Sequence, residues 1–319
     1  MPEGPEVRRH AVALDQALAG RPLIQIAART RAAKQWLLDH PNELLGRRVL
    51  QVRAHGKNLY GLIEGDYFFY SHLMMWGRWQ VMSSVELGVP DRRERARLVN
   101  EEYACVLYSA PVFEIGQGQP YEANEYLRSL GPDILPYEGA FDALEFLRRL
   151  MLPENRERDI GVVLLDQRIA AGIGNYLRAE ILFLCRLNPF RPSGTLNEAE
   201  LNCLVTSIAS IAKQAYEERG VTISEEWRER TLLDETLVYP GTRLREAAAR
   251  HAVFRRTNLP CLVCGEPIRQ LRQVTYVAGD DEDGSLQKAE EKSRIIYFCP
   301  QCQNVPLAAK KSRKKKVPA

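Results

Sequence analysis

The sequence predicts an α+β protein with three parts: an N-terminal β-sandwich with a leading helix, a helical domain, and a C-terminal hairpin that binds zinc. Three observations support this fold class. Short β-rich runs fill the first part of the chain, long helical patterns follow residue 132, and two C-x-x-C motifs stand near the C-terminus. The 319 residues are enough for two or three domains, each with its own core.

The first domain is expected to cover residues 1–135. Apolar side chains recur at helical spacing over residues 5–20, and Gly20 suits the C-terminal cap of that helix. From residue 23 to about residue 115, short β-rich runs alternate with glycine, proline and charged turns. This alternation is typical of a sandwich or a barrel.

A helical domain is expected over residues 136–249, where the longest helical pattern, 197–219, stops at Gly220. The following segment, 250–305, is too small to fold on a hydrophobic core alone. Its stability must therefore come from another source, such as a metal ion.

Four cysteines in this last segment supply that source, as the knuckles Cys261-Leu-Val-Cys264 and Cys299-Pro-Gln-Cys302. Each knuckle can direct two thiolates at one tetrahedral Zn²⁺, and four sulfur ligands leave no open position for catalysis. We predict one structural zinc ion, with redox-active or merely buried cysteines as the alternatives. The interval between the knuckles is longer than usual and contains the acidic run 280–283, interpreted as an exposed hairpin extension.

The three remaining cysteines, Cys105, Cys185 and Cys203, stand singly in apolar surroundings and are expected to be separate core thiols. No stretch approaches the ~20 apolar residues of a membrane-spanning helix, and the N-terminus lacks the layout of a secretory signal. We therefore expect no membrane partner and a compartment that keeps thiols reduced.

The net charge of +3 does not by itself point to nucleic acid. Six cations lie near the C-terminus, and removing their charges from +3 leaves −3 for the rest of the chain. These cations are Lys310, Lys311, Arg313, Lys314, Lys315 and Lys316. We expect the tail, residues 306–319, to be disordered, with a salt-sensitive contact to phosphates as its functional interpretation.

The N-terminal residues, Met1-Pro2-Glu3-Gly4-Pro5-Glu6, carry candidate chemistry. Proline at position two normally permits removal of Met1, which would expose a secondary amine. The reference pKa of an α-amino group is about 7.7–8.0 against about 10.4 for lysine, so its neutral fraction at pH 7 is roughly a hundredfold larger. Such an amine could attack C1′ of a deoxyribose and give an iminium ion that expels the base and then the phosphates.

Glu3 and Glu6 stand beside this amine and can protonate the opening sugar ring or stabilise positive charge. The alternative is that both carboxylates simply favour the N-terminus of the first helix.

Residues 164–180, LLDQRIAAGIGNYLRAE, resemble the helix–two-turn–helix signature of the formamidopyrimidine-DNA glycosylase and endonuclease VIII family. The MPEGPE start and the cysteine knuckles extend the likeness over nearly the whole chain, in the same order. Physically, Gly172 and Gly174 permit tight turns that leave N–H groups and the Asn175 amide free to bind a phosphate. The resemblance implies a bifunctional DNA glycosylase and AP lyase of base excision repair. We expect its partner to be damaged DNA, and the protein to be a monomer in the cytoplasm, associated with a bacterial-type nucleoid.

The resemblance also implies roles for individual residues. Pro2 would be the Schiff-base nucleophile, Glu3 the general acid and Glu6 the second carboxylate. Lys57 matches the family's catalytic lysine, and Arg294, five residues before the third cysteine, matches the arginine assigned to the second elimination. Without the resemblance, Lys57 would be interpreted as a solvated turn residue and Arg294 as a surface charge on an edge strand.

The segment 70–79, YSHLMMWGRW, is closer to the endonuclease VIII branch, as is Gly4, and this branch usually favours oxidised pyrimidines. The family fills the hole left by an everted base with wedge side chains from this loop, for which Met74, Met75 and Trp76 are suitable. The segment departs from the Gln-Leu-Tyr usual in that branch. The alternative is that these three side chains belong to the core.

The predicted reaction is base eversion, attack by Pro2 with acid assistance from Glu3, loss of the base, and β- and δ-elimination, with DNA between the first domain and the rest. One alternative is a zinc-containing protein that recognises damaged DNA without cutting it. Another is a zinc-ribbon module that binds RNA. The combination of Pro2, Glu3 and Lys57 argues against the first alternative, and the second leaves the N-terminal motif without a purpose.

Overall fold

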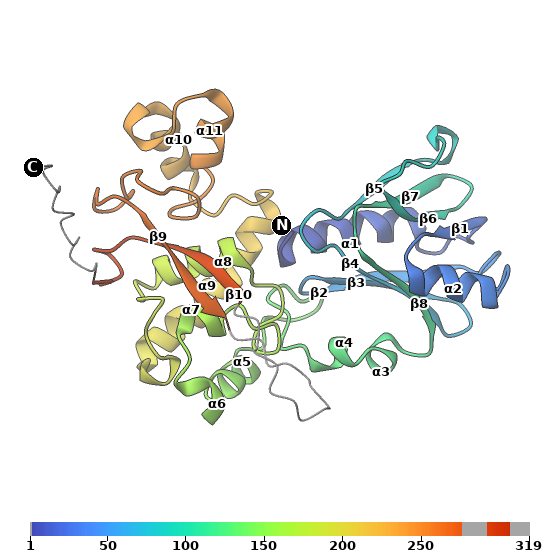
Figure 1. Ribbon diagram of the computed structural model, residues 1–319, viewed down its shortest axis with the longest axis horizontal. Helices are drawn as coiled ribbons and strands as arrows, with labels where there is room; N and C mark the ends of the chain where they lie inside the picture. Colours follow the sequence, from blue (N-terminus) through green and yellow to red (C-terminus); the bar gives the residue numbers. More distant parts are fainter. Residues whose placement is uncertain (1, 276–291, 307–319) are drawn as a thin grey trace, which may run out of the picture.

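The computed structural model describes residues 2–275 and 292–306, and Figure 1 shows their arrangement. A β-sandwich with two helices forms one half of the molecule. A group of helices and a two-stranded hairpin form the other half. This is the predicted fold class, and the acidic run 280–283 and the basic tail lie outside the described residues.

The sandwich consists of two antiparallel four-stranded sheets, with strand orders β1-β6-β7-β5 and β2-β3-β4-β8. The strands are β1 (Gln25–Ala28), β2 (Val49–His55), β3 (Asn58–Ile63), β4 (Tyr67–His72), β5 (Arg78–Ser83), β6 (Glu94–Val99), β7 (Tyr103–Tyr108) and β8 (Val112–Gln117). Helix α2 (Arg31–Asp39) packs beside β8, and η1 (Ser84–Glu86) follows β5.

Helix α1 (Gly4–Leu18) confirms the predicted N-terminal helix and packs against β2. Its apolar stripe, which includes Val7, Leu14 and Leu18, is buried in the same core as Phe69 and Phe113 from the second sheet. Burying each of these larger side chains contributes about 1.5–3 kcal/mol, so this core fixes α1 on the sandwich.

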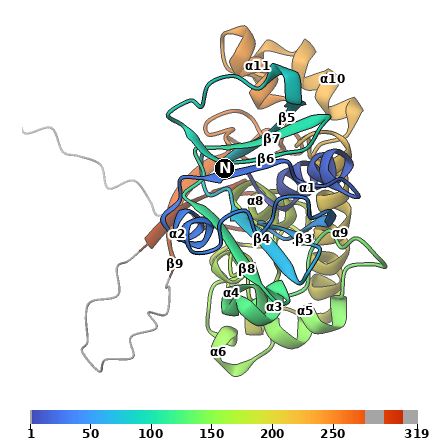
Figure 2. The same cartoon turned by 90° about the vertical axis from the view of Figure 1, so that its right-hand side faces the viewer.

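Two short helices, α3 (Pro120–Ala123) and α4 (Glu125–Ser129), lead from the sandwich to the helical half. The helices of that half are α5 (Ala143–Leu150), α6 (Pro153–Arg156), α7 (Ile160–Val163), α8 (Asn175–Leu184), η2 (Ser193–Thr195), α9 (Glu198–Glu217), α10 (Glu225–Leu233), η3 (Glu235–Leu237) and α11 (Thr242–Ala248). Figure 2, which views the molecule from the sandwich, shows α10 and α11 at the opposite end from α5 and α6.

Helix α8 is central to the helical half, because its residues from Tyr176 to Phe183 are all buried. It packs against α7, α9 and the hairpin strand β10 (Lys292–Phe298), which pairs antiparallel with β9 (Arg269–Thr275). Helix α9 also packs against α1, so it contacts both halves of the molecule.

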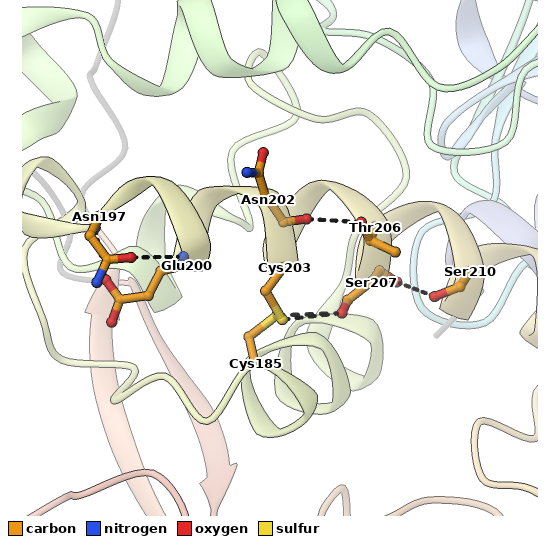
Figure 3. Close-up of a disulfide and its surroundings, with 8 residues drawn as sticks. All are labelled: Cys185, Asn197, Glu200, Asn202, Cys203, Thr206, Ser207 and Ser210. Carbon is orange, nitrogen blue, oxygen red and sulfur yellow. Dashed lines mark hydrogen bonds between the residues drawn. A yellow bond between two sulfur atoms is a disulfide. The ribbon is translucent and has the colours of Figure 1, made fainter.

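Cys185 and Cys203 form a disulfide between the end of α8 and the second turn of α9 (Figure 3). The expectation that they are separate core thiols is therefore wrong, and both residues are half-buried. Their proximity depends on how α9 crosses α8, which the local apolar pattern does not reveal. Cys105 is a fully buried free thiol, as expected.

None of the described helices combines the length and the apolar character required to cross a bilayer.

Candidate active site

Three chain segments meet where the two halves touch: the start of α1, the turn between β2 and β3, and the turn before α8. The Gly4 N–H donates to the Gly172 carbonyl at 2.9 Å. Gly56 and Gly172 both have positive φ, +56° and +114°, and a Cβ at Gly56 would lie 2.6 Å from the Gly172 nitrogen. Only glycine allows this approach, which brings the residues beside these turns together.

Glu3 is buried, with 2% of its surface exposed. Its carboxylate accepts backbone N–H bonds from Gly174, Tyr176 and Leu177 at 2.8, 2.9 and 3.2 Å. The N-terminus of α8 therefore holds the carboxylate, with the helix dipole aligned favourably for negative charge. Burial nevertheless raises the pKa of Glu3 to about 7, against the opposing effects of Lys57 and the backbone donors.

Lys57 also lies at the turn before α8, where its Nζ donates to the Ile173 carbonyl at 2.5 Å. Burial, together with the charges of Arg294 and Arg178, lowers the pKa of Lys57 to about 8 against the opposing effect of Glu3. The interpretation of Lys57 as a solvated turn residue is therefore wrong. Glu3 and Lys57 are thus close enough for the charge of each to shift the pKa of the other.

Glu6 fixes the first turn of α1. Its Oε2 accepts the Glu3 N–H at 3.0 Å, and its Oε1 accepts from Arg9 at 2.9 Å. The Tyr176 hydroxyl lies 3.2 and 3.3 Å from the two oxygens. Because Pro2 directly precedes Glu3, this network also restricts where the Pro2 nitrogen can lie. Pro2 is half-buried, and Met1 lies outside the described residues.

Asn175 and Gly174 lie at the N-terminus of α8, as predicted. The Asn175 Oδ1 accepts from Arg178 at 2.7 Å, and no described residue bonds its Nδ2. Arg294 is exposed on β10, near enough for its charge to affect the pKa of Lys57. These groups provide an amide donor and a guanidinium for an anionic ligand. The expectation that the turn leaves its N–H groups free is wrong for Gly172, which donates to Gln167, and for Gly174, which donates to Glu3.

Arg178 was not predicted as a site residue, although it is fully buried. Besides Asn175, its guanidinium donates to the Ile295 carbonyl on β10 at 2.9 Å and to Gln273 on β9 at 3.2 Å. It therefore joins the α8 N-terminus to both hairpin strands. Its place three residues after Asn175, on the same helix face, is the signal that could have identified it.

The three wedge candidates lie in the turn between β4 and β5, and all are exposed: Met74 by 46%, Met75 by 52% and Trp76 by 78%. The core alternative is therefore wrong for them. The Met74 N–H donates to the His72 Nδ1 at 3.1 Å, and Met74 has a φ of +52°. His72, also missed, stands opposite Asn58 in the β3–β4 register and so lies close to Lys57.

The four knuckle cysteines converge, with all Sγ atoms within 4.8 Å of one another. Zn–S bonds of about 2.3 Å in a tetrahedron require S–S separations of about 3.8 Å. The Cys261–Cys302 and Cys264–Cys299 separations, 3.8 and 3.4 Å, are close to that value. The donor set therefore fits zinc. All four positions would be filled by sulfur, so the metal would hold the hairpin and supply no reactive group.

Comparisons with known proteins identify two matching family models. The formamidopyrimidine-DNA glycosylase N-terminal domain matches residues 1–109, and the formamidopyrimidine-DNA glycosylase H2TH domain matches residues 130–226. Endonuclease 8 of Pectobacterium atrosepticum is 32% identical over 304 residues, which cover 95% of this chain and 100% of that protein. Endonuclease 8 of Salmonella enteritidis is 31% identical over 303 residues, with the same coverage.

Two solved structures show the same fold. The Lactococcus lactis Fpg in complex with abasic-site-containing DNA has a TM-score of 0.70 and 23% identity, covering 94% of this chain and 99% of that chain. A second complex, of that enzyme with DNA containing N7-benzyl-Fapy-dG, has a TM-score of 0.69 and 22% identity, with 95% and 99% coverage.

Proposed function

We propose that this chain, which belongs to the formamidopyrimidine-DNA glycosylase and endonuclease VIII family, removes oxidised pyrimidines from damaged DNA. The members of this family are base-excision-repair enzymes, DNA glycosylases with AP lyase activity. The proposed reaction uses a Schiff base to Pro2 and ends with β- and δ-elimination. The observation that carries this proposal is the buried Glu3 carboxyl on the α8 N-terminus, with Lys57 beside it and Pro2 next in the chain.

In the proposed first step, the neutral amine of Pro2 attacks C1′, forming an N–C bond. The base leaves with the electron pair of the glycosidic bond and takes up the proton of the Pro2 amine. The C1′–O4′ bond then breaks as its oxygen receives the Glu3 proton, and an iminium ion remains. A pKa of about 7 for Glu3 supports this role, because about half of such carboxyls carry a proton at pH 7.

The iminium then withdraws electrons from the sugar. Loss of a C2′ proton breaks the bond to the 3′ phosphate, and a second elimination releases the 5′ phosphate. We propose that Lys57 and Arg294 bind these phosphates and assist the eliminations, while the amide of Asn175, placed by the turn at Gly174, holds a neighbouring phosphate.

We further propose that Met74, Met75 and Trp76 enter the duplex when the damaged nucleotide swings out. Their exposure and apolar character support this role, because a side chain can stack in the vacated space only if it is free.

We propose one structural zinc ion on Cys261, Cys264, Cys299 and Cys302, and a monomer that acts on the nucleoid in the cytoplasm, where its substrate lies. The domain boundaries proposed are 1–135, 136–249, 250–305 and a tail at 306–319.

Borohydride trapping with an abasic oligonucleotide tests the covalent chemistry. We expect a stable adduct at Pro2 that Pro2→Gly suppresses and that Lys213→Ala, a change of an exposed lysine on α9, leaves unchanged. Intact-mass analysis should show that Met1 is absent from active protein. Tight binding to damaged DNA without any adduct would instead support the alternative of a non-cutting damage-binding protein.

Oligonucleotides that each carry one oxidised purine or one oxidised pyrimidine test the substrate class. Faster excision of the purines under single-turnover conditions would refute the pyrimidine preference and leave the lyase chemistry intact.

A further inference from the structure

Cys185 and Cys203 lie outside the candidate active site and take no part in the proposed reaction. Cys185 directly follows α8, and Cys203 lies in α9, 18 residues later. Their Cα atoms are 5.7 Å apart, within the usual range for a disulfide, so the backbone does not have to move for the bond to form or open.

We propose that this pair is a redox-controlled crosslink, formed by a peroxide and reopened by a dithiol, that stabilises the helical half of the protein. Cys185 and Cys203 neither hold zinc nor contact the predicted site residues, so this role is independent of the catalytic mechanism.

The surroundings of the pair suit this chemistry. Both cysteines are half-buried, so a small oxidant can reach them. The buried Ser207 hydroxyl lies 3.4 Å from the Cys185 sulfur and 3.8 Å from the Cys203 sulfur (Figure 3). It can donate a hydrogen bond to whichever sulfur is ionised, and the thiolate is the form that reacts.

The proposed oxidation proceeds in two steps. One thiolate attacks a peroxide oxygen, the O–O bond breaks, and a sulfenic acid and hydroxide form. The second thiolate then attacks the sulfenic sulfur, so that the S–S bond forms and the S–O bond breaks. Overall, two thiols lose two electrons and two protons, and hydrogen peroxide becomes two molecules of water. A dithiol reverses the crosslink by thiol–disulfide exchange.

The crosslink joins two helices that both contact the start of α1. The N-terminus of α8 binds the Glu3 carboxylate, and carbonyls at the end of α9 accept from Arg9. Closing the intervening loop removes conformational freedom from the unfolded chain. For this separation we expect the midpoint of thermal unfolding of the full-length protein to rise by about 5 °C.

The test uses full-length, zinc-loaded protein, treated with hydrogen peroxide or with dithiothreitol under conditions that preserve its zinc content. Alkylation and peptide mapping should show Cys185 and Cys203 blocked as one disulfide-linked pair after peroxide and free after dithiothreitol. The oxidised protein should melt at the higher temperature. Cys203→Ser and Cys203→Ala should each lose this redox-dependent difference, whereas Cys105→Ala should retain it.

Three results would overturn the proposal: Cys185 and Cys203 that stay open to alkylation after peroxide, a crosslinked protein that melts no higher than the reduced one, or the same redox-dependent shift in both Cys203 variants. Two substitutions at Cys203 are included so that poor folding of one does not decide the outcome.

Discussion

Replacing Gly174 with alanine should remove most of the lyase activity, although no residue with a proposed chemical role is replaced. Gly174 has a φ of −124°, which any residue adopts, so the backbone tolerates alanine. The new Cβ, however, would lie 2.3 Å from the Cδ of Glu3 and 2.4 Å from its Oε1. Carbon atoms normally approach to about 3.5–4.0 Å, so the carboxyl would have to move by more than about 1 Å.

This displacement sets the expected magnitude. Misplacing a reacting group by about 1 Å can reduce the rate about 10²-fold, which is the loss we expect in single-turnover cleavage of abasic DNA. The N–H groups of Gly174, Tyr176 and Leu177 would also lose a charged acceptor. Water can partly replace the carboxylate as the acceptor for these N–H groups, so the free energy of unfolding should fall by only about 2–4 kcal/mol.

Gly88→Ala is the matched control, because a Cβ at Gly88 would meet no atom within 4 Å. Both variants should be assayed for abasic-site cleavage, borohydride trapping and thermal unfolding. If Gly174→Ala cleaves within about threefold of the unchanged protein, a tightly held Glu3 is not required and this reasoning is refuted.

Three further predictions concern pH, zinc and the wedge loop. Because the pKa of Glu3 is raised to about 7, its protonated fraction falls as the pH rises through that value. The rate of single-turnover cleavage should therefore decline on the alkaline side, and a rate that still increases at pH 9 would contradict the role of Glu3 as the acid. Purified protein should contain one zinc ion per chain by elemental analysis, and chelation should lower the unfolding temperature and weaken binding to damaged DNA; an unchanged unfolding temperature after complete removal would argue against a structural metal. Trp76→Ala should slow excision from duplex DNA about tenfold or more but leave single-stranded substrates nearly unaffected, whereas equal losses on both would exclude a wedge.

Much of this fold and site is predictable from the sequence because the informative residues are close in the chain. Each cysteine knuckle spans four residues, and the Met1–Glu6 segment places its amine and carboxylates side by side. The glycine turn before α8 is equally local, because Gly172 and Gly174 predict a tight backbone turn without any knowledge of the segment that packs against it.

The features that escaped prediction depend on packing between distant segments. The spacing of Arg178 from Asn175 is local, but its bonds to the hairpin exist only because β9 and β10 lie against α8. His72 comes close to Lys57 only because β3 pairs with β4. The Cys185–Cys203 bond depends on the crossing of α8 and α9. The raised pKa of Glu3 also follows from burial, which a motif does not report.

Helix α1 belongs to the sandwich by its core, yet its first turns are held by the other half of the molecule. Glu3 is bound by α8, and Arg9 donates to the carbonyls of Ala215 and Tyr216 at the end of α9. Any hinge motion that separated the two halves would break the bonds between Glu3 and the N-terminus of α8, and the proposed general acid would lose its position. A molecule opened in this way would lack its positioned acid, and reactivity would return only when the two halves closed again.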